Sequence, residues 1–112
     1  GAIGAALVVS LVGALVDLET GEMLPRRWAQ WRRHDPIHLV GAWADNLRSL
    51  AGIYVDCGWR DQYHLHFGAR ILSRQLAAHG IRHRYEEFDD THSSIDYRMD
   101  VSLPFLYRAV KP

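Results

Sequence analysis

The sequence has one cysteine, no excess of charge of either sign and no hydrophobic run of membrane-spanning length. With Cys57 alone among 112 residues, no disulfide can form within the chain, and nothing indicates an oxidising compartment. Lys and Arg number 13, as do Asp and Glu, so the formal net charge is zero. Without a basic field, the chain is not expected to bind nucleic acid or an acidic membrane surface.

The apolar segment of residues 2–16 is too short to predict a membrane span, which needs about 18–20 residues. It also lacks the basic start and the polar cleavage site of a signal peptide. We therefore expect a buried element of a soluble, cytoplasmic fold, with a membrane or signal remnant as the competing interpretation. Within it, residues 6–12 are rich in β-branched side chains and predict a buried strand, with helix as the alternative.

Hydrophobic residues make up 48% of the sequence, enough for the core of a single domain over residues 1–112. Residues 25–34 predict a short surface helix that carries Trp28 and Trp31. Asp35 and Pro36 then predict a helix start, because Asp caps free N–H groups and Pro suits the first helical position. The expected apolar face of this helix comprises Val40, Trp43, Leu47 and Leu50.

The second half of the sequence predicts two strands, each followed by a helix. Residues 52–55 predict a strand ended by Asp56–Gly58, and residues 82–88 predict a less apolar strand nearer an edge. Gly80 is expected to stop the helix of residues 62–79. The last helix spans residues 95–110, and Pro104 should kink or split it. The predicted buried faces are Leu65, Ala69, Leu72 and Leu76 in the first helix, and Met99, Leu103, Leu106 and Val110 in the second.

Strands that alternate with helices of this length predict an α/β fold with about three parallel strands and flanking helices. Ligands of such sheets lie beyond the carboxyl ends of the strands. Asp61 and His92 both follow predicted strand ends, so we expect them at the same edge of the sheet.

Several segments, taken in order, resemble the putative-esterase family of the α/β-hydrolase fold, which includes esterase D-like and feruloyl-esterase-like enzymes. The resemblance covers roughly residues 17–110. The segments that carry it are Asp17–Glu22, Trp31 with Asp35–Pro36, Tyr54–Gly58 with Asp61, His79–Ile81, Tyr85–Phe88, His92, Asp96–Arg98 and Ser102–Leu106.

The resemblance implies a serine esterase with a Ser-His-Asp triad, in which Asp61 is the acid and His92 the base. It implies a small-molecule ester substrate and no cofactor or metal. The family's serine lies in a G-x-S-x-G turn, which no serine of this sequence occupies. The chain therefore resembles the C-terminal part of the catalytic domain, a partial α/β-hydrolase fold.

Two functions follow from the missing serine. The chain is a hydrolase or a fragment of one, associated with a segment that carries the nucleophile. Alternatively, it is an inactive remnant that forms a homo-oligomer, because a partial sheet leaves a raw edge and an uncovered apolar face.

Simpler interpretations stay open for each candidate residue. Asp61 is also placed to cap the helix that follows it, and Asp56 is a rival acid. His92 could be an exposed loop histidine. Cys57 suits a small buried residue better than a substitute nucleophile, and no histidine spacing matches a zinc site. Trp28 and Trp31 could lie near a substrate pocket or only cover the core.

Overall fold

The computed structural model describes residues 15–112. The chain divides into two compact units, residues 1–38 and residues 39–112, and each is considered separately. The strand predicted over residues 6–12 lies outside the described residues, and the single domain over residues 1–112 stays a prediction. Among the described residues, no helix is both long and apolar enough to cross a membrane.

The first unit contains a tight turn followed by a short helix. Val16 and Met23 form an antiparallel bridge, and the Asp17 carboxylate closes the turn between them by accepting the backbone N–H groups of Glu19 and Thr20 at 2.9 Å each. Helix α2 spans Pro25–Arg32, which confirms the predicted helix; Pro25 stands in its first turn, where a missing N–H has no cost.

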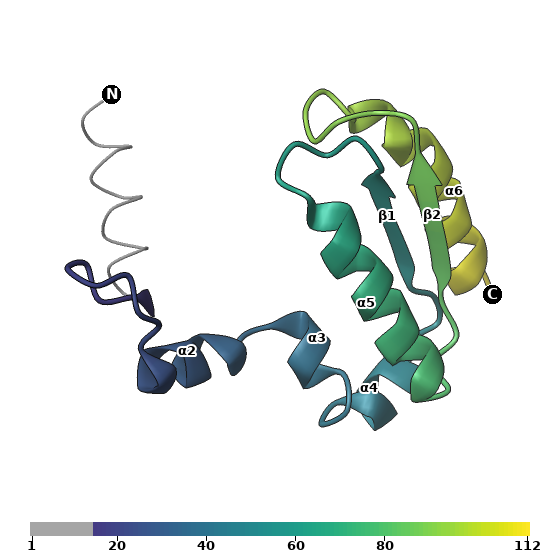
Figure 1. The fold of residues 1–112 in the computed structure, drawn as a ribbon. Helices are drawn as coiled ribbons and strands as arrows, with labels where there is room; N and C mark the ends of the chain where they lie inside the picture. The colour runs from purple at the N-terminus through teal and green to yellow at the C-terminus, as the bar shows by residue number, and fades with distance from the viewer. Residues whose placement is uncertain (1–14) are drawn as a thin grey trace. The chain divides into compact units, whose positions relative to one another are not determined.

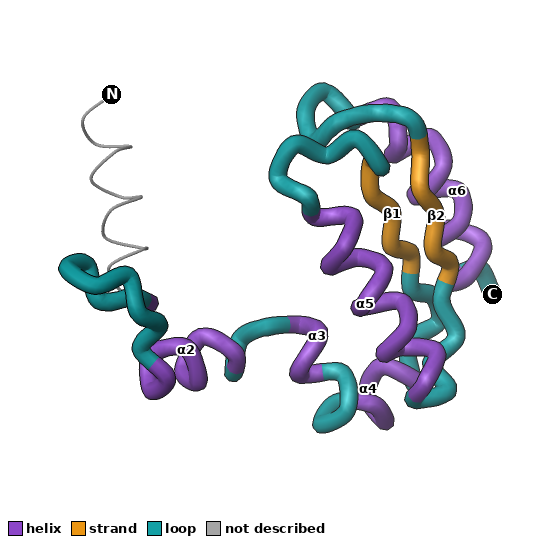
Figure 2. Tube along the Cα trace, in the orientation of Figure 1, coloured by secondary structure: helices purple, strands orange, loops and turns teal. Residues whose placement is uncertain are grey.

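The second unit is a two-stranded parallel sheet with a helix on each face (Figure 1; Figure 2). Strand β1 (Tyr54–Gly58) pairs with β2 (Arg84–Phe88), and Tyr54 lies opposite Arg84 in the register. Helix α5 (Leu65–Ala78) connects the two strands and covers one face. On the other face lie the 3-10 turn η1 (Asp96–Arg98) and helix α6 (Met99–Val110).

This arrangement confirms a mixed α/β structure with a parallel βαβ unit. Two of the expected strands are paired among the described residues, and the third, over residues 6–12, lies outside them, so a sheet of about three strands stays a prediction.

The core of the second unit is small and is closed by the end of α5. Its buried apolar side chains are Val40, Ala44, Leu76 and Ile81. The Ile81 N–H bonds to the Leu76 carbonyl at 2.9 Å and the Gly80 N–H to the Ala77 carbonyl at 3.0 Å, the Schellman pattern of a helix end. Gly80 has φ +66°, a conformation that glycine adopts without strain, and it confirms the predicted stop.

The helix predicted after Pro36 is two short helices, α3 (Pro36–Leu39) and α4 (Ala44–Arg48). Asp35 does cap α3, since its Oδ1 accepts the Ile37 N–H at 2.9 Å. The interruption includes Gly41, where an added Cβ would lie 3.1 Å from Nε2 of His79. The predicted single apolar face is therefore wrong. Val40 is buried, but Trp43 and Leu50 are 56% and 55% exposed.

Two boundaries around β1 and α5 also differ from prediction. Asp56–Gly58 belong to the strand rather than ending it. Helix α5 begins at Leu65 instead of residue 62; Leu65 is exposed and His66 is buried. Leu72 and Leu76 lie toward the core as predicted.

Helix α6 differs most from prediction. It continues through Pro104 without splitting, although Pro104 has no N–H to donate to the carbonyl one turn earlier. Helix α6 packs on the segment that precedes β1 through Phe105 and Ala109, which lie against Gly52. The stripe predicted to be buried is exposed instead, by 55%, 58%, 37% and 67% at Met99, Leu103, Leu106 and Val110.

Candidate active site

Two loops meet beyond the carboxyl ends of β1 and β2, at one end of the sheet in Figure 1. Residues 59–64 follow β1 and residues 89–95 follow β2. Backbone hydrogen bonds join the loops, from Trp59 N–H to the Phe88 carbonyl at 3.0 Å and from Arg60 N–H to the Asp90 carbonyl at 3.1 Å. The two loops therefore form one surface, although they are about 30 residues apart in sequence.

Asp61 and His92 lie in contact on this surface. The His92 Nδ1 atom is 2.9 Å from the Asp61 Oδ2 atom. The Asp61 side chain is 2% exposed, whereas the His92 side chain is 47% exposed. The prediction that both residues lie at one edge of the sheet is confirmed in its geometry, and their catalytic role stays a prediction.

The second carboxylate oxygen of Asp61 organises the loop. Oδ1 accepts the backbone N–H of Tyr63 at 2.8 Å and that of Leu65 at 3.4 Å. Oδ1 thus holds the turn that leads into α5, whose N-cap residue is His64 rather than Asp61, while Oδ2 contacts His92. Burial raises the pKa of Asp61, but the hydrogen bonds from His92, Tyr63 and Leu65 outweigh it and hold that pKa below its usual value.

Gln62 and Tyr63 position His92, and no sequence motif pointed to either residue. The Gln62 Oε1 atom accepts the His92 backbone N–H at 3.0 Å. The rings of Tyr63 and His92 meet edge to face, with centroids 5.2 Å apart. These contacts depend on the two loops meeting in space, so no local pattern could have found them.

Gly58, the last residue of β1, allows the loops to approach. A Cβ added there would lie 2.3 Å from the Asp90 carbonyl oxygen and 2.7 Å from that of Thr91. Any side chain at this position would therefore displace the backbone just before His92.

The geometry fits a general base. With Asp61 ionised, its Oδ2 accepts the Nδ1 proton, so the neutral imidazole carries its lone pair on Nε2. Within residues 15–112, no hydrogen bond joins His92 Nε2 to another group, a serine hydroxyl included. A neutral imidazole oriented in this way can accept a proton at Nε2, while the carboxylate stabilises the resulting imidazolium.

Asp56, the rival acid, faces another group of residues. Its Oδ2 accepts from Arg98 Nε at 2.9 Å and from the Tyr54 hydroxyl at 3.2 Å. Arg98 also donates to Glu86 at 2.8 Å. Asp56 therefore helps to hold η1 against the sheet, and the carboxylate paired with His92 is that of Asp61.

The other candidate residues do not extend the site. Cys57 is half-buried, and burial, together with the nearby carboxylate of Asp61, raises its pKa, which disfavours the nucleophilic thiolate. No cluster of three or more metal-ligating side chains occurs within the described range. In the first unit, Trp28 and Trp31 are 40% and 45% exposed and line a hollow of about 380 Å³ with Asp35 and Pro36.

No protein-family model matches the chain, and a search of curated proteins finds no match.

Proposed function

We propose that the chain supplies the acid and the base for carboxylic-ester hydrolysis, with Asp61 as the acid and His92 as the base. The observation that carries the proposal is the 2.9 Å contact between His92 Nδ1 and Asp61 Oδ2, beyond the carboxyl ends of two neighbouring parallel strands. The resemblance of residues 17–110 to the putative-esterase family supports the same roles.

The proposed reaction moves one proton in each direction. A hydroxyl oxygen attacks the acyl carbon of a small ester, and its proton passes to His92 Nε2. The imidazolium then returns this proton to the departing alkoxide oxygen, and the acyl group stays on the attacking oxygen. Water then attacks this acyl group through the same two proton transfers by His92, which releases the carboxylic acid and restores the hydroxyl. Asp61 holds the Nδ1–H tautomer throughout and stabilises the imidazolium by its negative charge.

The attacking hydroxyl is proposed to come from an associated segment, because no serine of this sequence stands in a G-x-S-x-G turn. Water can take its place with an activated ester, at a much lower rate. The chain alone is therefore expected to be a slow catalyst.

Hydrolysis of p-nitrophenyl acetate by the pure protein tests the roles of both residues. We expect slow turnover, most of which is lost in His92→Ala and in Asp61→Asn. The asparagine amide would donate to Nδ1 and place the proton on Nε2, which removes the base. His38→Ala is the matched control, because His38 is also an exposed histidine but lies in the first unit. If His92→Ala and Asp61→Asn each retain wild-type turnover, the proposal is wrong.

A second candidate is a catalytically inactive protein that associates with copies of itself. The observation in its favour is the apolar stripe of α6, where Leu103 and Val110 are 58% and 67% exposed. Sedimentation of the pure protein tests it, and a monomeric mass at micromolar concentration would count against this candidate.

A further inference from the structure

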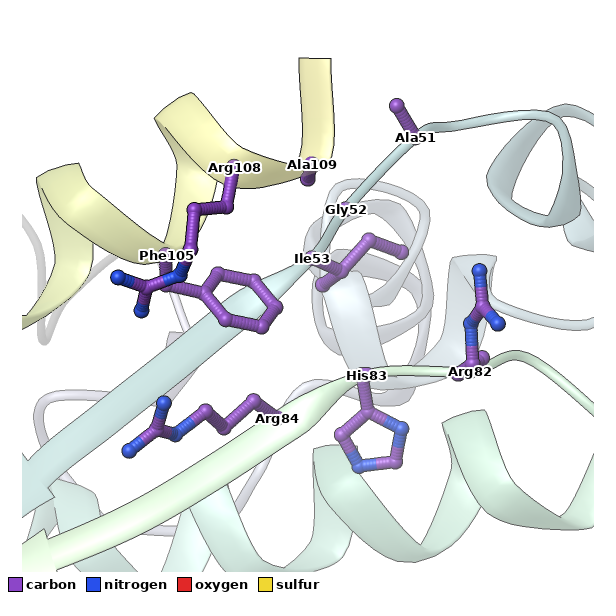
Figure 3. Close-up of a pocket in the computed structure, with 9 residues that line it drawn as sticks. All are labelled: Ala51, Gly52, Ile53, Arg82, His83, Arg84, Phe105, Arg108 and Ala109. Atoms are coloured by element: carbon purple, nitrogen blue, oxygen red, sulfur yellow. The ribbon is translucent and has the colours of Figure 1, made fainter. Parts of the chain in front are cut away.

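We infer that the second unit binds an organic phosphate at the amino-terminal end of its sheet, opposite the loops of Asp61 and His92. A hollow of about 390 Å³ lies there, between the residues that lead into β1 and β2 and the last turns of α6 (Figure 3). This volume falls within the range of small-ligand sites, about 300–1,000 Å³.

The charge of the lining is of one sign. Three arginines line the hollow, Arg82, Arg84 and Arg108, and none of its nine lining residues is acidic. Arg84 is paired with Glu86 along its strand, with Nε 2.7 Å from Oε1. Among residues 15–112, no ion pair joins Arg82 or Arg108 to a carboxylate. A chain with zero net charge thus concentrates positive charge that its own carboxylates do not fully neutralise.

The orientation of the side chains matches one anion better than several. In Figure 3, the guanidinium groups of Arg84 and Arg108 extend in the same direction beside the Phe105 ring, whereas Arg82 points elsewhere. The planar guanidinium forms two parallel hydrogen bonds with phosphate oxygens. Two guanidinium groups that line one hollow and extend to the same side suit a dianion, which favours a phosphate monoester over a carboxylate.

Phe105 gives the site an apolar side. Its ring stands 5.7 Å from the Arg84 guanidinium carbon and 5.6 Å from the Tyr54 ring. Gly52 lets α6 approach here, since a Cβ on Gly52 would lie 2.8 Å from that of Ala109. The ligand is therefore expected to carry an aromatic or other apolar group next to its phosphate.

His83 lines the hollow but its ring is already bonded elsewhere. Nε2 lies 2.7 Å from the Ser73 hydroxyl and Nδ1 lies 3.0 Å from the Ile81 carbonyl. The ring points toward α5 (Figure 3) and holds the segment before β2 against that helix. The arginines, not His83, are therefore expected to bind the anion.

Titration of the full chain with phenyl phosphate, followed by backbone amide NMR shifts, tests the site. We expect saturable shifts at Gly52, Arg84 and Arg108, weakened by added NaCl because the contacts are exposed. Inorganic phosphate and benzoate should bind more weakly, the first because it lacks the ring and the second because it has one charge. Arg108→Gln should weaken phenyl phosphate binding about tenfold, as the loss of a charge-assisted pair predicts.

Two further variants keep the test decisive. Arg74→Gln removes an exposed arginine of α5 that lies outside the hollow and should leave the affinity unchanged. Arg108→Lys keeps the charge but loses the planar fork, so its affinity should fall between wild type and Arg108→Gln. The inference is overturned if Arg108→Gln binds as tightly as wild type, if benzoate binds as tightly as phenyl phosphate, or if shifts do not saturate. Because the readout is binding, these outcomes are independent of ester hydrolysis.

Discussion

The carboxylates of Asp61 and Asp56 lie near the end of the same strand, yet they bind different partners. Asp61 divides its two oxygens between His92 and the backbone of the following loop. Asp56 is two residues from the strand end, yet it pairs with Arg98. The family resemblance favoured Asp61, whereas Asp56 stands closer to the strand end; only the paired contacts in the structure separate the two carboxylates.

Glu87 illustrates how such a contact makes stability depend on pH. Arg70 of α5 donates to both of its oxygens, at 2.6 and 2.9 Å, and the Tyr85 hydroxyl donates at 2.6 Å. The bonds from Arg70, followed by that from Tyr85, lower the pKa of Glu87 from 4.5 to about 2. A lowered pKa means that the ionised form stabilises the fold above the unfolded value and that this stabilisation is lost as pH falls toward 2.

We therefore predict that Glu87→Gln destabilises the protein at pH 6 and that its difference from wild type shrinks by pH 3. Urea unfolding at the two pH values measures this difference. Glu19→Gln is the matched control, because Glu19 is exposed in the turn of the first unit and its carboxylate has no hydrogen bond within the described residues. A difference that stays constant between pH 6 and pH 3 would contradict the assigned pKa.

At the scale of elements, the spacing of apolar residues predicted the strands and helices, while close contacts set their ends. The βαβ order and the Gly80 stop followed from the sequence. The break between α3 and α4 did not, because it coincides with the approach of His79 to Gly41. Nor did the burial of His66 in place of Leu65, because packing decides which face of α5 meets the core.

Gly58→Ala is predicted to disturb the site although it removes none of the site's side chains. The new Cβ would overlap the carbonyl oxygens of Asp90 and Thr91, so the loop of His92 must move. We expect a loss of about 1–3 kcal/mol in the free energy of unfolding, typical of overpacking. We also expect the Asp61–His92 contact to weaken, which NMR of the His92 ring nitrogens would detect.

Gly68→Ala is the matched control for this change. Gly68 lies inside α5 with open space around its position. Alanine should stabilise the helix there by about 0.5–1 kcal/mol. If Gly58→Ala behaves like Gly68→Ala, the close approach at Gly58 has no energetic consequence.

At the scale of the whole molecule, few apolar side chains of residues 15–112 are buried and many large ones are exposed. Four apolar side chains of the described residues are buried, whereas the exposed large hydrophobics include all four residues of the α6 stripe. In the described part, each of the two strands also has one edge without a neighbouring strand. Such surfaces are typical of proteins that associate with a partner or with themselves.

We predict that this association depends on α6. Leu103→Glu combined with Val110→Glu places charges on the exposed stripe and should raise the dissociation constant of the self-associated form more than about tenfold. Sedimentation across a concentration series measures the effect. Leu18→Glu is the control, since Leu18 is 67% exposed in the first unit. Equal association of the double variant and the wild type would contradict a role for α6.

The sequence by itself determined the mixed α/β character, the parallel βαβ unit and the placement of Asp61 and His92 after neighbouring strands. These features depend on local periodicity and on the handed connection of strand and helix, which short segments encode. The tertiary structure decided which atoms meet: His92 with Asp61 rather than Asp56, Gln62 with His92, and the arginines around one hollow. It also decided that the predicted core stripe of α6 is exposed, because packing selects among apolar faces that periodicity cannot distinguish.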